Sequence, residues 1–322
     1  MMEMINIFAL MNEVLFYDPF KSFDLVGAKC FLTGVPVSKG IDKISVFPKW
    51  LMESEDLYEK AFKLLDESFC TYQDLFLGVS NEVAEKINVL NEKSNLAFNT
   101  GDKDLLTDTE WFQWAGVMVY GLVSAEIRNG LKSDEYKEDG FKVSPVLVNK
   151  FRKLHNLLQS LLNSFEWDAP LPFSLFKFSL LEEEGIPTFE HRNEINTLTF
   201  SFRYKKVGVI LCLLDNELNK EYHQPLLLEK YNEEISLVQF EEIAARVYYS
   251  NYLLSIIPDF SFTEHNNTIY VTNVETAIGN RTIFEPWVEK TYAQVLEAFW
   301  KPWNYSRVEI LKNPEKAITF LS

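Results

Sequence analysis

Apolar side chains recur at every third or fourth position along several stretches of the chain, and this spacing predicts amphipathic helices. The first stretch covers residues 53–76 and the second residues 81–97. A third helix is expected from the capping sequence at residues 107–110, whose side chains can satisfy the free backbone donors of a helix start. This helix is apolar on nearly all sides, so we expect it to be buried at the centre of a helical layer.

In the second half of the chain the period drops to two, which is typical of strands. Residues 197–204 alternate large apolar with small or polar side chains, so we expect Leu198, Phe200 and Phe202 to face the core and the other face to meet water. Residues 207–214 are apolar on both sides, which predicts a more central strand antiparallel to the first. The remaining predicted elements are helices at residues 144–165, 239–257 and 286–301, a strand at residues 176–180, and a hairpin at residues 260–274.

These elements predict an α+β protein with two parts. An N-terminal helical layer is followed by a domain of the order α-βββ-α-ββ-α, whose sheet is mainly antiparallel. The charged stretch at residues 132–142 contains a glycine and is the expected boundary. We therefore expect a mostly helical domain over residues 1–140 and an α+β domain over residues 141–322, each long enough for its own core.

The element order of residues 144–303, together with the acidic composition, resembles the small α/β fold of the type III secretion chaperones. The resemblance covers about half of the chain and rests on topology and acidity, since no sequence motif of that family is matched residue by residue. Members of the family are small single-domain dimers, whereas this chain carries an additional helical half. The resemblance implies a chaperone-like protein that binds another protein, with a homodimer as a further possibility.

The net charge of the chain restricts the classes of partner that we expect it to bind. The chain has 31 Lys and Arg against 47 Asp and Glu, which gives a formal net charge of -16. This charge repels phosphates, so we expect neither nucleic-acid binding nor attraction to anionic membranes. It suits a basic or partly unfolded protein partner, and it also keeps a protein in solution. The apolar N-terminal stretch lacks the basic residues of a signal peptide, so we expect a cytoplasmic location.

Motifs of known chemistry are missing from the sequence. It contains no GxxxxGK(S/T), GxGxxG, GxSxG, HExxH or CxxC pattern. Cys30, Cys70 and Cys212 form no disulfide framework, and we expect each to pack as a small hydrophobic residue. The sequence therefore predicts no catalytic residue, no metal site and no cofactor.

The nearest approach to a chemical cluster is formed by Glu190, His191, Arg192 and Glu194, between two predicted strands. His191 could act as a general base that a carboxylate orients, while Arg192 could bind an anion. The other interpretation is a solvated loop of mixed charge. We prefer the loop, because the sequence supplies no nucleophile or metal beside it.

Aromatic residues gather around the C-terminal helix: Trp287, Trp300, Trp303 and Tyr305. If they are exposed together, they form a binding patch for a protein partner or a sugar ring. If they pack against the sheet, they belong to the core, and we prefer this second interpretation. Trp303 follows Pro302 and is expected to be the most exposed of the four.

One amide stands out in the helix predicted at residues 239–257. Asn251 lies on the apolar stripe of this helix, between Val247 and Leu254. A buried amide without partners costs about 1–3 kcal/mol. We expect it either to bind a strand edge or a dimer mate, or to lie at the boundary of the stripe.

Together these features predict a non-catalytic, cytoplasmic protein that binds another protein in a chaperone-like, inhibitory or regulatory role. The binding surface would be an apolar patch within an acidic surround. The alternative is an enzyme acting on a small molecule, with residues 190–194 at its cleft. A nucleic-acid mimic is disfavoured, because the acidic residues are scattered rather than arrayed.

Overall fold

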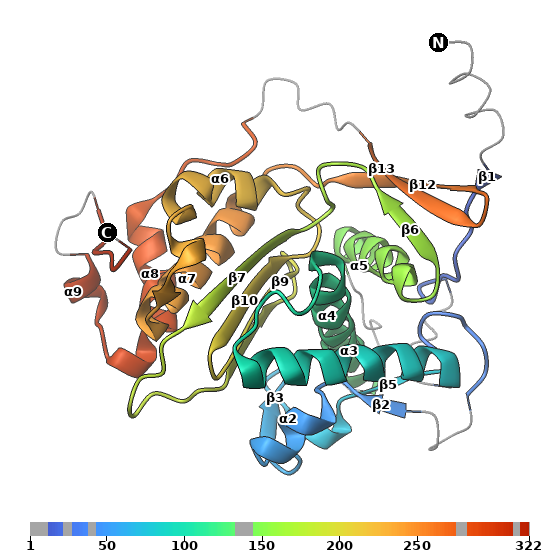
Figure 1. The fold of residues 1–322 in the computed structure, drawn as a ribbon, viewed down its shortest axis with the longest axis horizontal. Coiled ribbons are helices and arrows are strands. Elements are labelled where there is room, and N and C mark those ends of the chain that lie inside the picture. Colours follow the sequence, from blue (N-terminus) through green and yellow to red (C-terminus); the bar gives the residue numbers. More distant parts are fainter. Residues whose placement is uncertain are drawn as a thin grey trace. The chain divides into compact units, whose positions relative to one another are not determined.

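The computed structural model describes residues 12–21, 28–37, 43–132, 144–274, 282–311 and 316–321 (Figure 1). It has the α+β class that the sequence predicts, with mainly antiparallel sheets. Among the helices of these residues, none is long and apolar enough to cross a membrane. The chain groups by contact into two compact units. Unit 1 holds Met1–Asn95, Thr109–Ala169 and Phe260–Asn273, and unit 2 holds Leu96–Asp108, Pro170–Asp259 and Val274–Ser322.

Unit 1 combines helices with short strands. A four-stranded sheet has the order β1-β12-β13-β6, and two strand pairs, β2–β5 and β3–β4, lie apart from it. Its elements, some of which extend past the unit's limits, are β1 (Asn12–Glu13), β2 (Lys43–Ser45), α2 (Lys49–Ser54), β3 (Ala61–Lys63), β4 (Phe69–Thr71), the 3-10 turn Tyr72–Asp74, β5 (Phe76–Gly78), α3 (Asn81–Thr100), α4 (Asp108–Lys132), α5 (Pro145–Leu158), the 3-10 turn Gln159–Leu161, β6 (Ser164–Trp167), β12 (Asp259–His265) and β13 (Thr268–Val274).

The central helix of unit 1 is α4, which begins at Asp108, inside the predicted capping sequence, and is buried on nearly all sides. Helix α5 packs closely against it: a Cβ atom added at Gly116 would lie 2.9 Å from Leu158. Gln113 of α4 also donates a hydrogen bond of 3.0 Å to the carbonyl of Ser160. These contacts group α5 with unit 1, which also includes Phe260–Asn273, while unit 2 includes Leu96–Asp108. The predicted division at residue 140 stays a prediction. Most of the charged stretch at 132–142 lies outside the described residues.

The helix predicted at residues 53–76 is wrong. The structure places the short helix α2 and the hairpin β3–β4 there instead. The hairpin turn is fixed locally: the carboxylate of Asp66 accepts hydrogen bonds from the backbone and hydroxyl of Ser68, and Glu67 adopts a positive φ of 67°. The spacing of residues 53–76 would place Leu65 and Phe69 on the inward face of a helix, yet they are 72% and 67% exposed.

Unit 2 is built on a five-stranded sheet of the order β11-β7-β10-β9-β8. Helices α6, α7 and α8 lie together on one side of this sheet in Figure 1. The elements are β7 (Ser174–Leu180), β8 (Glu190–Glu194), β9 (Thr199–Tyr204), β10 (Val207–Cys212), α6 (Leu218–Leu227), the 3-10 turn Lys230–Asn232, β11 (Glu234–Ile235), α7 (Leu237–Leu253), α8 (Glu289–Phe299), the 3-10 turn Lys301–Trp303 and α9 (Arg307–Ile310).

The two strands predicted at the centre of this sheet are present as β9 and β10, and they pair antiparallel. Leu198, Phe200 and Phe202 are fully buried, which confirms their predicted inward orientation. The prediction that the other face of β9 meets solvent is wrong, because the polar residues that alternate with these rings are also buried: Thr199, Ser201 and Arg203. Helix α7 supplies a hydrogen-bond partner for each of the three, which offsets much of the cost of burying polar side chains of the strand.

Candidate functional site

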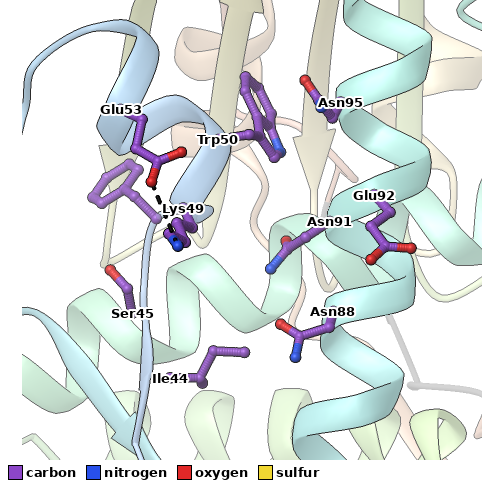
Figure 2. A pocket seen from close by; sticks show the side chains of 10 residues that line it. Ile44, Ser45, Lys49, Trp50, Glu53, Asn88, Asn91, Glu92 and Asn95 are labelled. Carbon is purple, nitrogen blue, oxygen red and sulfur yellow. Dashed lines mark ion pairs between the residues drawn. The ribbon is translucent and has the colours of Figure 1, made fainter.

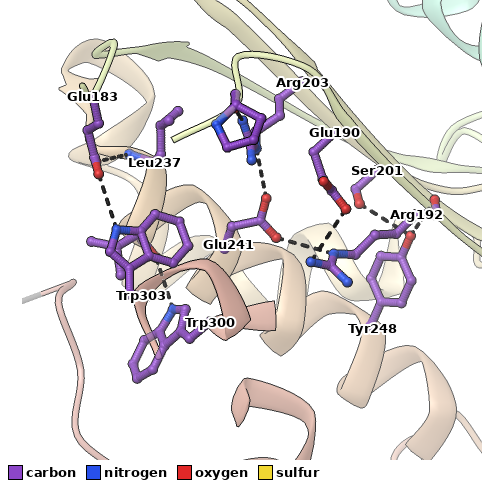
Figure 3. Close-up of polar contacts among 12 residues, drawn as sticks. Glu183, Glu190, Arg192, Ser201, Arg203, Leu237, Glu241, Tyr248, Trp300 and Trp303 are labelled. Carbon is purple, nitrogen blue, oxygen red and sulfur yellow. Dashed lines mark hydrogen bonds and ion pairs between the residues drawn. The ribbon is translucent and has the colours of Figure 1, made fainter. Parts of the chain in front are cut away.

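Residues 190–194 form the edge strand β8, which pairs antiparallel with β9, and not the predicted loop. The Arg192 guanidinium lies 3.6 Å from a carboxylate oxygen of Glu190 and 3.3 Å from one of Glu241 in α7 (Figure 3). Its cationic carbon also lies 4.4 Å above the ring of Phe299. Arg192 is therefore held from three sides by the protein itself.

Glu241 joins two arginines within unit 2. Its second carboxylate oxygen lies 2.9 Å from Nε of Arg203, and both of these side chains are almost fully buried. Arg203 also donates through Nη1 to the carbonyl of Pro187. Burial raises the pKa of Glu241, while Arg192 and Arg203 oppose that rise. The cluster ties β8 and β9 to α7, so its geometry is that of a structural ion-pair network.

The remaining residues of the predicted cluster do not complete a catalytic arrangement. Burial, with the charge of Arg192, lowers the pKa of His191 to about 4, which makes it a weak base at neutral pH. Its ring packs 5.6 Å from the ring of Phe189. Glu194 accepts hydrogen bonds from the backbone and side chain of Asn196 in the following turn. These contacts favour a structural role for β8.

Of the four aromatic residues near the C-terminal helix, Trp300 is fully buried. Its indole Nε1 donates a hydrogen bond of 3.2 Å to the carbonyl of Val238. Its ring centroid lies 5.4 Å from that of Tyr305 and 5.2 Å from that of Phe320. Trp300 and the half-buried Tyr305 therefore pack together in the core of unit 2, as the preferred interpretation expected.

The other two tryptophans are half-buried and also pack on this core. Trp303 donates from Nε1 to a carboxylate oxygen of Glu183 at 3.2 Å, as drawn in Figure 3. Trp287 packs against the rings of Tyr249 and Tyr292, with centroid distances of 4.6 and 4.7 Å. Trp300 thus lies in the core, and the other three aromatic residues pack against that core instead of gathering with it on one open face.

A buried polar network that the sequence did not reveal lies where β10 leads into α6. Asp215 is fully buried, and its Oδ2 accepts hydrogen bonds from the Ser174 hydroxyl at 2.6 Å and from the Asn219 backbone at 3.0 Å. Its other oxygen, Oδ1, has no hydrogen-bond partner within the described residues. Burial raises the pKa of Asp215 to about 6.

The network continues across to α7. The Asn219 carboxamide donates to Asn251 at 3.0 Å, and Asn251 donates to the Thr199 hydroxyl at 2.8 Å. Ser250 donates to Asn219 and lies 2.8 Å from Nε2 of His223. Asn251 therefore does bind the end of a strand, which was one of the two expected placements. The network fixes α6 against α7 through polar contacts, so its members are positioned by the fold and are closed to solvent.

Replacing Asp215 with asparagine should remove a pH dependence of stability. The folded state holds the Asp215 proton more tightly than an unfolded chain, so this carboxyl favours folding at low pH and the contribution is lost as pH rises toward 6. The wild type should therefore lose about 1–3 kcal/mol of unfolding free energy between about pH 4 and about pH 7 through this carboxyl. Asp215→Asn lacks the carboxyl, so its unfolding free energy should rise by that amount relative to the wild type over the same pH range. Urea unfolding of both proteins at the two pH values measures this, and a constant difference would contradict the assignment.

Helix α6 exposes apolar side chains on a second face. The inward face of α6 is buried and includes both polar and apolar side chains. On the other face, Tyr222 and Leu226 lie one turn apart and are 46% and 40% exposed. The Tyr222 ring packs on Phe284 at a centroid distance of 4.7 Å, and the neighbouring Ile283 is 37% exposed. We call these four residues the Tyr222 patch.

The backbone holds the Tyr222 patch in place. Beside the end of α7, the Ser255 amide donates to the carbonyl of Ile283 at 2.9 Å, and the Glu285 amide donates to the carbonyl of Leu253 at 2.8 Å. The segment that carries Phe284 is thereby fixed to the end of a helix. A rigid surface loses little conformational entropy when a partner binds to it.

No protein-family model, curated protein or solved structure matches this chain. The resemblance to type III secretion chaperones therefore stays a prediction. Among the described residues there is also no group of three or more His, Cys, Asp or Glu side chains that could hold a metal ion.

Proposed function

We propose that this protein is a non-catalytic, cytoplasmic binding protein, chaperone-like or inhibitory, whose protein partner docks on the Tyr222 patch. The observation that carries this proposal is the second apolar face of α6, where the exposed Tyr222 and Leu226 lie beside the half-buried Phe284 and the exposed Ile283. Exposed apolar surface that is contiguous and rigid is a common feature of protein interfaces. Tyrosine in particular is enriched among the residues that dominate binding energy.

The charge of the chain indicates which partner would suit the patch. Glu221 and Glu285 adjoin Tyr222 and Phe284 in sequence, and both are exposed. The whole chain carries a net charge of -16, which accelerates encounter with a positively charged protein. The expected partner therefore presents apolar anchor residues with Lys or Arg around them.

Affinity purification from the native cell with matched variants tests this function. Leu226→Glu places a charge in the patch and should lose the partner that the wild type retains, with a drop in recovery of at least about tenfold. Val308→Glu is the control. Val308 is 82% exposed on α9, so this substitution adds the same charge away from the patch. Recovery of the same proteins by all three baits would contradict the proposal. A wild-type dimer that Leu226→Glu dissociates would identify a second copy as the partner.

A further inference from the structure

Unit 1 contains a hollow of about 380 Å³ between α2 and α3, remote in sequence from the Tyr222 patch (Figure 2). Most of the side chains that line it are polar and uncharged or belong to an ion pair. The half-buried indole of Trp50 is the one large aromatic ring of its lining that solvent reaches, since Phe47, also part of the lining, is fully buried. The lining of this hollow therefore suits a neutral, polar ligand that has one apolar face.

One wall of the hollow is a row of carboxamides on α3. Asn88, Asn91 and Asn95 fall at intervals of three and four residues, so they share one face of the helix. Figure 2 shows all three side chains reaching from α3 toward the side of the hollow that carries Lys49 and Trp50. Each carboxamide offers a donor and an acceptor at the same time.

Two of these carboxamides are available to a ligand. Neither Asn88 nor Asn91 uses its side chain in a hydrogen bond within the described part of the chain. An adjacent face of α3 is buried in unit 1 through residues that include Ile87 and Leu90. The amides are thus presented on a rigid element, which is the arrangement that gives a binding site its geometry.

The charges around the hollow do not select an ion. Lys49 and Glu53 stand one turn apart on α2 and form an ion pair of 3.5 Å, as Figure 2 shows. The remaining charged group of the lining is the exposed Glu92, whose carboxylate can accept hydrogen bonds from hydroxyl groups. An anionic ligand would meet this carboxylate without a free cation to balance it.

We propose that this hollow is a binding site for a neutral carbohydrate, with room for one or two pyranose rings. The C–H face of the sugar ring would pack on the indole of Trp50, because the partly negative face of an aromatic ring attracts the partly positive C–H hydrogens. Sugar hydroxyls both donate and accept hydrogen bonds, and they match the carboxamides of Asn88 and Asn91 and the carboxylate of Glu92. An extended peptide would fit less well, since it needs a separate pocket for each alternate side chain, whereas the apolar part of this lining is one group around Ile44 and Trp50.

A binding assay with the full chain on an array of neutral glycans tests this site. The array carries oligosaccharides that end in glucose, galactose, mannose or N-acetylglucosamine. We expect the wild type to retain at least one of these classes, with binding at least about tenfold weaker for Trp50→Ala and for Asn91→Ala. Trp50→Phe keeps an aromatic face and should recover part of the binding.

The control is Asn81→Ala, which removes an exposed carboxamide at the start of the same helix, outside the hollow. It should bind glycans as the wild type does, and thermal melting confirms that each variant is folded. Absence of wild-type binding to every glycan would overturn the proposal. Equal binding by the wild type, Trp50→Ala and Asn91→Ala would overturn it as well. Binding of a peptide array in place of glycans would show the hollow to be a peptide site.

Discussion

Replacing Glu241 with alanine should lower the free energy of unfolding by about 3–5 kcal/mol, because the change leaves buried charge without its counter-ion. Arg203 has only 1% of its side chain exposed and lies 2.9 Å from Glu241. Arg192 would lose the same partner and keep the exposed side of its contacts, Glu190 and the ring of Phe299. Since α7 is tied to β8 and β9 through this carboxylate, the loss should appear in the global unfolding transition. Urea unfolding followed by circular dichroism measures it.

The matched control is an ion pair at the surface. Glu297 and Arg307 approach to 2.9 Å, but 37% and 47% of their side chains are exposed, so water screens the pair. Glu297→Ala should therefore destabilise the protein far less than Glu241→Ala. Glu241→Gln, which keeps an acceptor for Arg203, should fall between the two. Equal effects at positions 241 and 297 would show that the buried network contributes no more than a surface pair.

Replacing Trp300 with alanine should cost about 3–5 kcal/mol of stability, as expected when a large buried ring is removed and a cavity remains. The ring is fully buried between Tyr305 and Phe320. Trp300→Phe should restore part of this loss, while leaving the carbonyl of Val238 without its indole donor. Chemical unfolding with circular dichroism as the signal gives these differences without relying on tryptophan fluorescence.

This variant also separates the two interpretations of the C-terminal aromatic residues. If Trp300 belongs to the core, Trp300→Ala loses stability more than the same change at the half-buried Trp303. If instead Trp300→Ala unfolds like the wild type and fails to retain a protein partner, Trp287, Trp300, Trp303 and Tyr305 form a binding surface after all. The Tyr222 patch would then be the wrong site.

The elements with a strong and regular apolar pattern could be predicted from the sequence. Helix α4 and strands β9 and β10 lie where the period of their apolar residues placed them. In residues 53–76 the same spacing was misleading, because Leu65 and Phe69 are exposed on either side of a hairpin turn. The local hydrogen bonds of Asp66 stabilise the turn there, and the spacing of apolar residues does not reveal such polar contacts.

The candidate sites depended on long-range contacts and were largely missed. Helix α6 buries Asn219 and His223 and exposes Tyr222, the reverse of an ordinary amphipathic pattern, and it contains Pro225. The patch also requires Phe284, which lies 62 positions after Tyr222 and is brought there by pairing at the end of α7. Only the position of Asn251 on an apolar stripe gave an early sign that polar residues meet inside this unit.

Photo-crosslinking in the native cell tests the central claim, that the Tyr222 patch binds a protein, most directly. A photoreactive phenylalanine analogue at position 226 keeps the patch apolar, and the same residue at position 308 serves as the control on an exposed apolar position elsewhere. The proposed function predicts a discrete crosslinked species from position 226 and none from position 308. The same faint or diffuse products from both positions would contradict a partner at this patch.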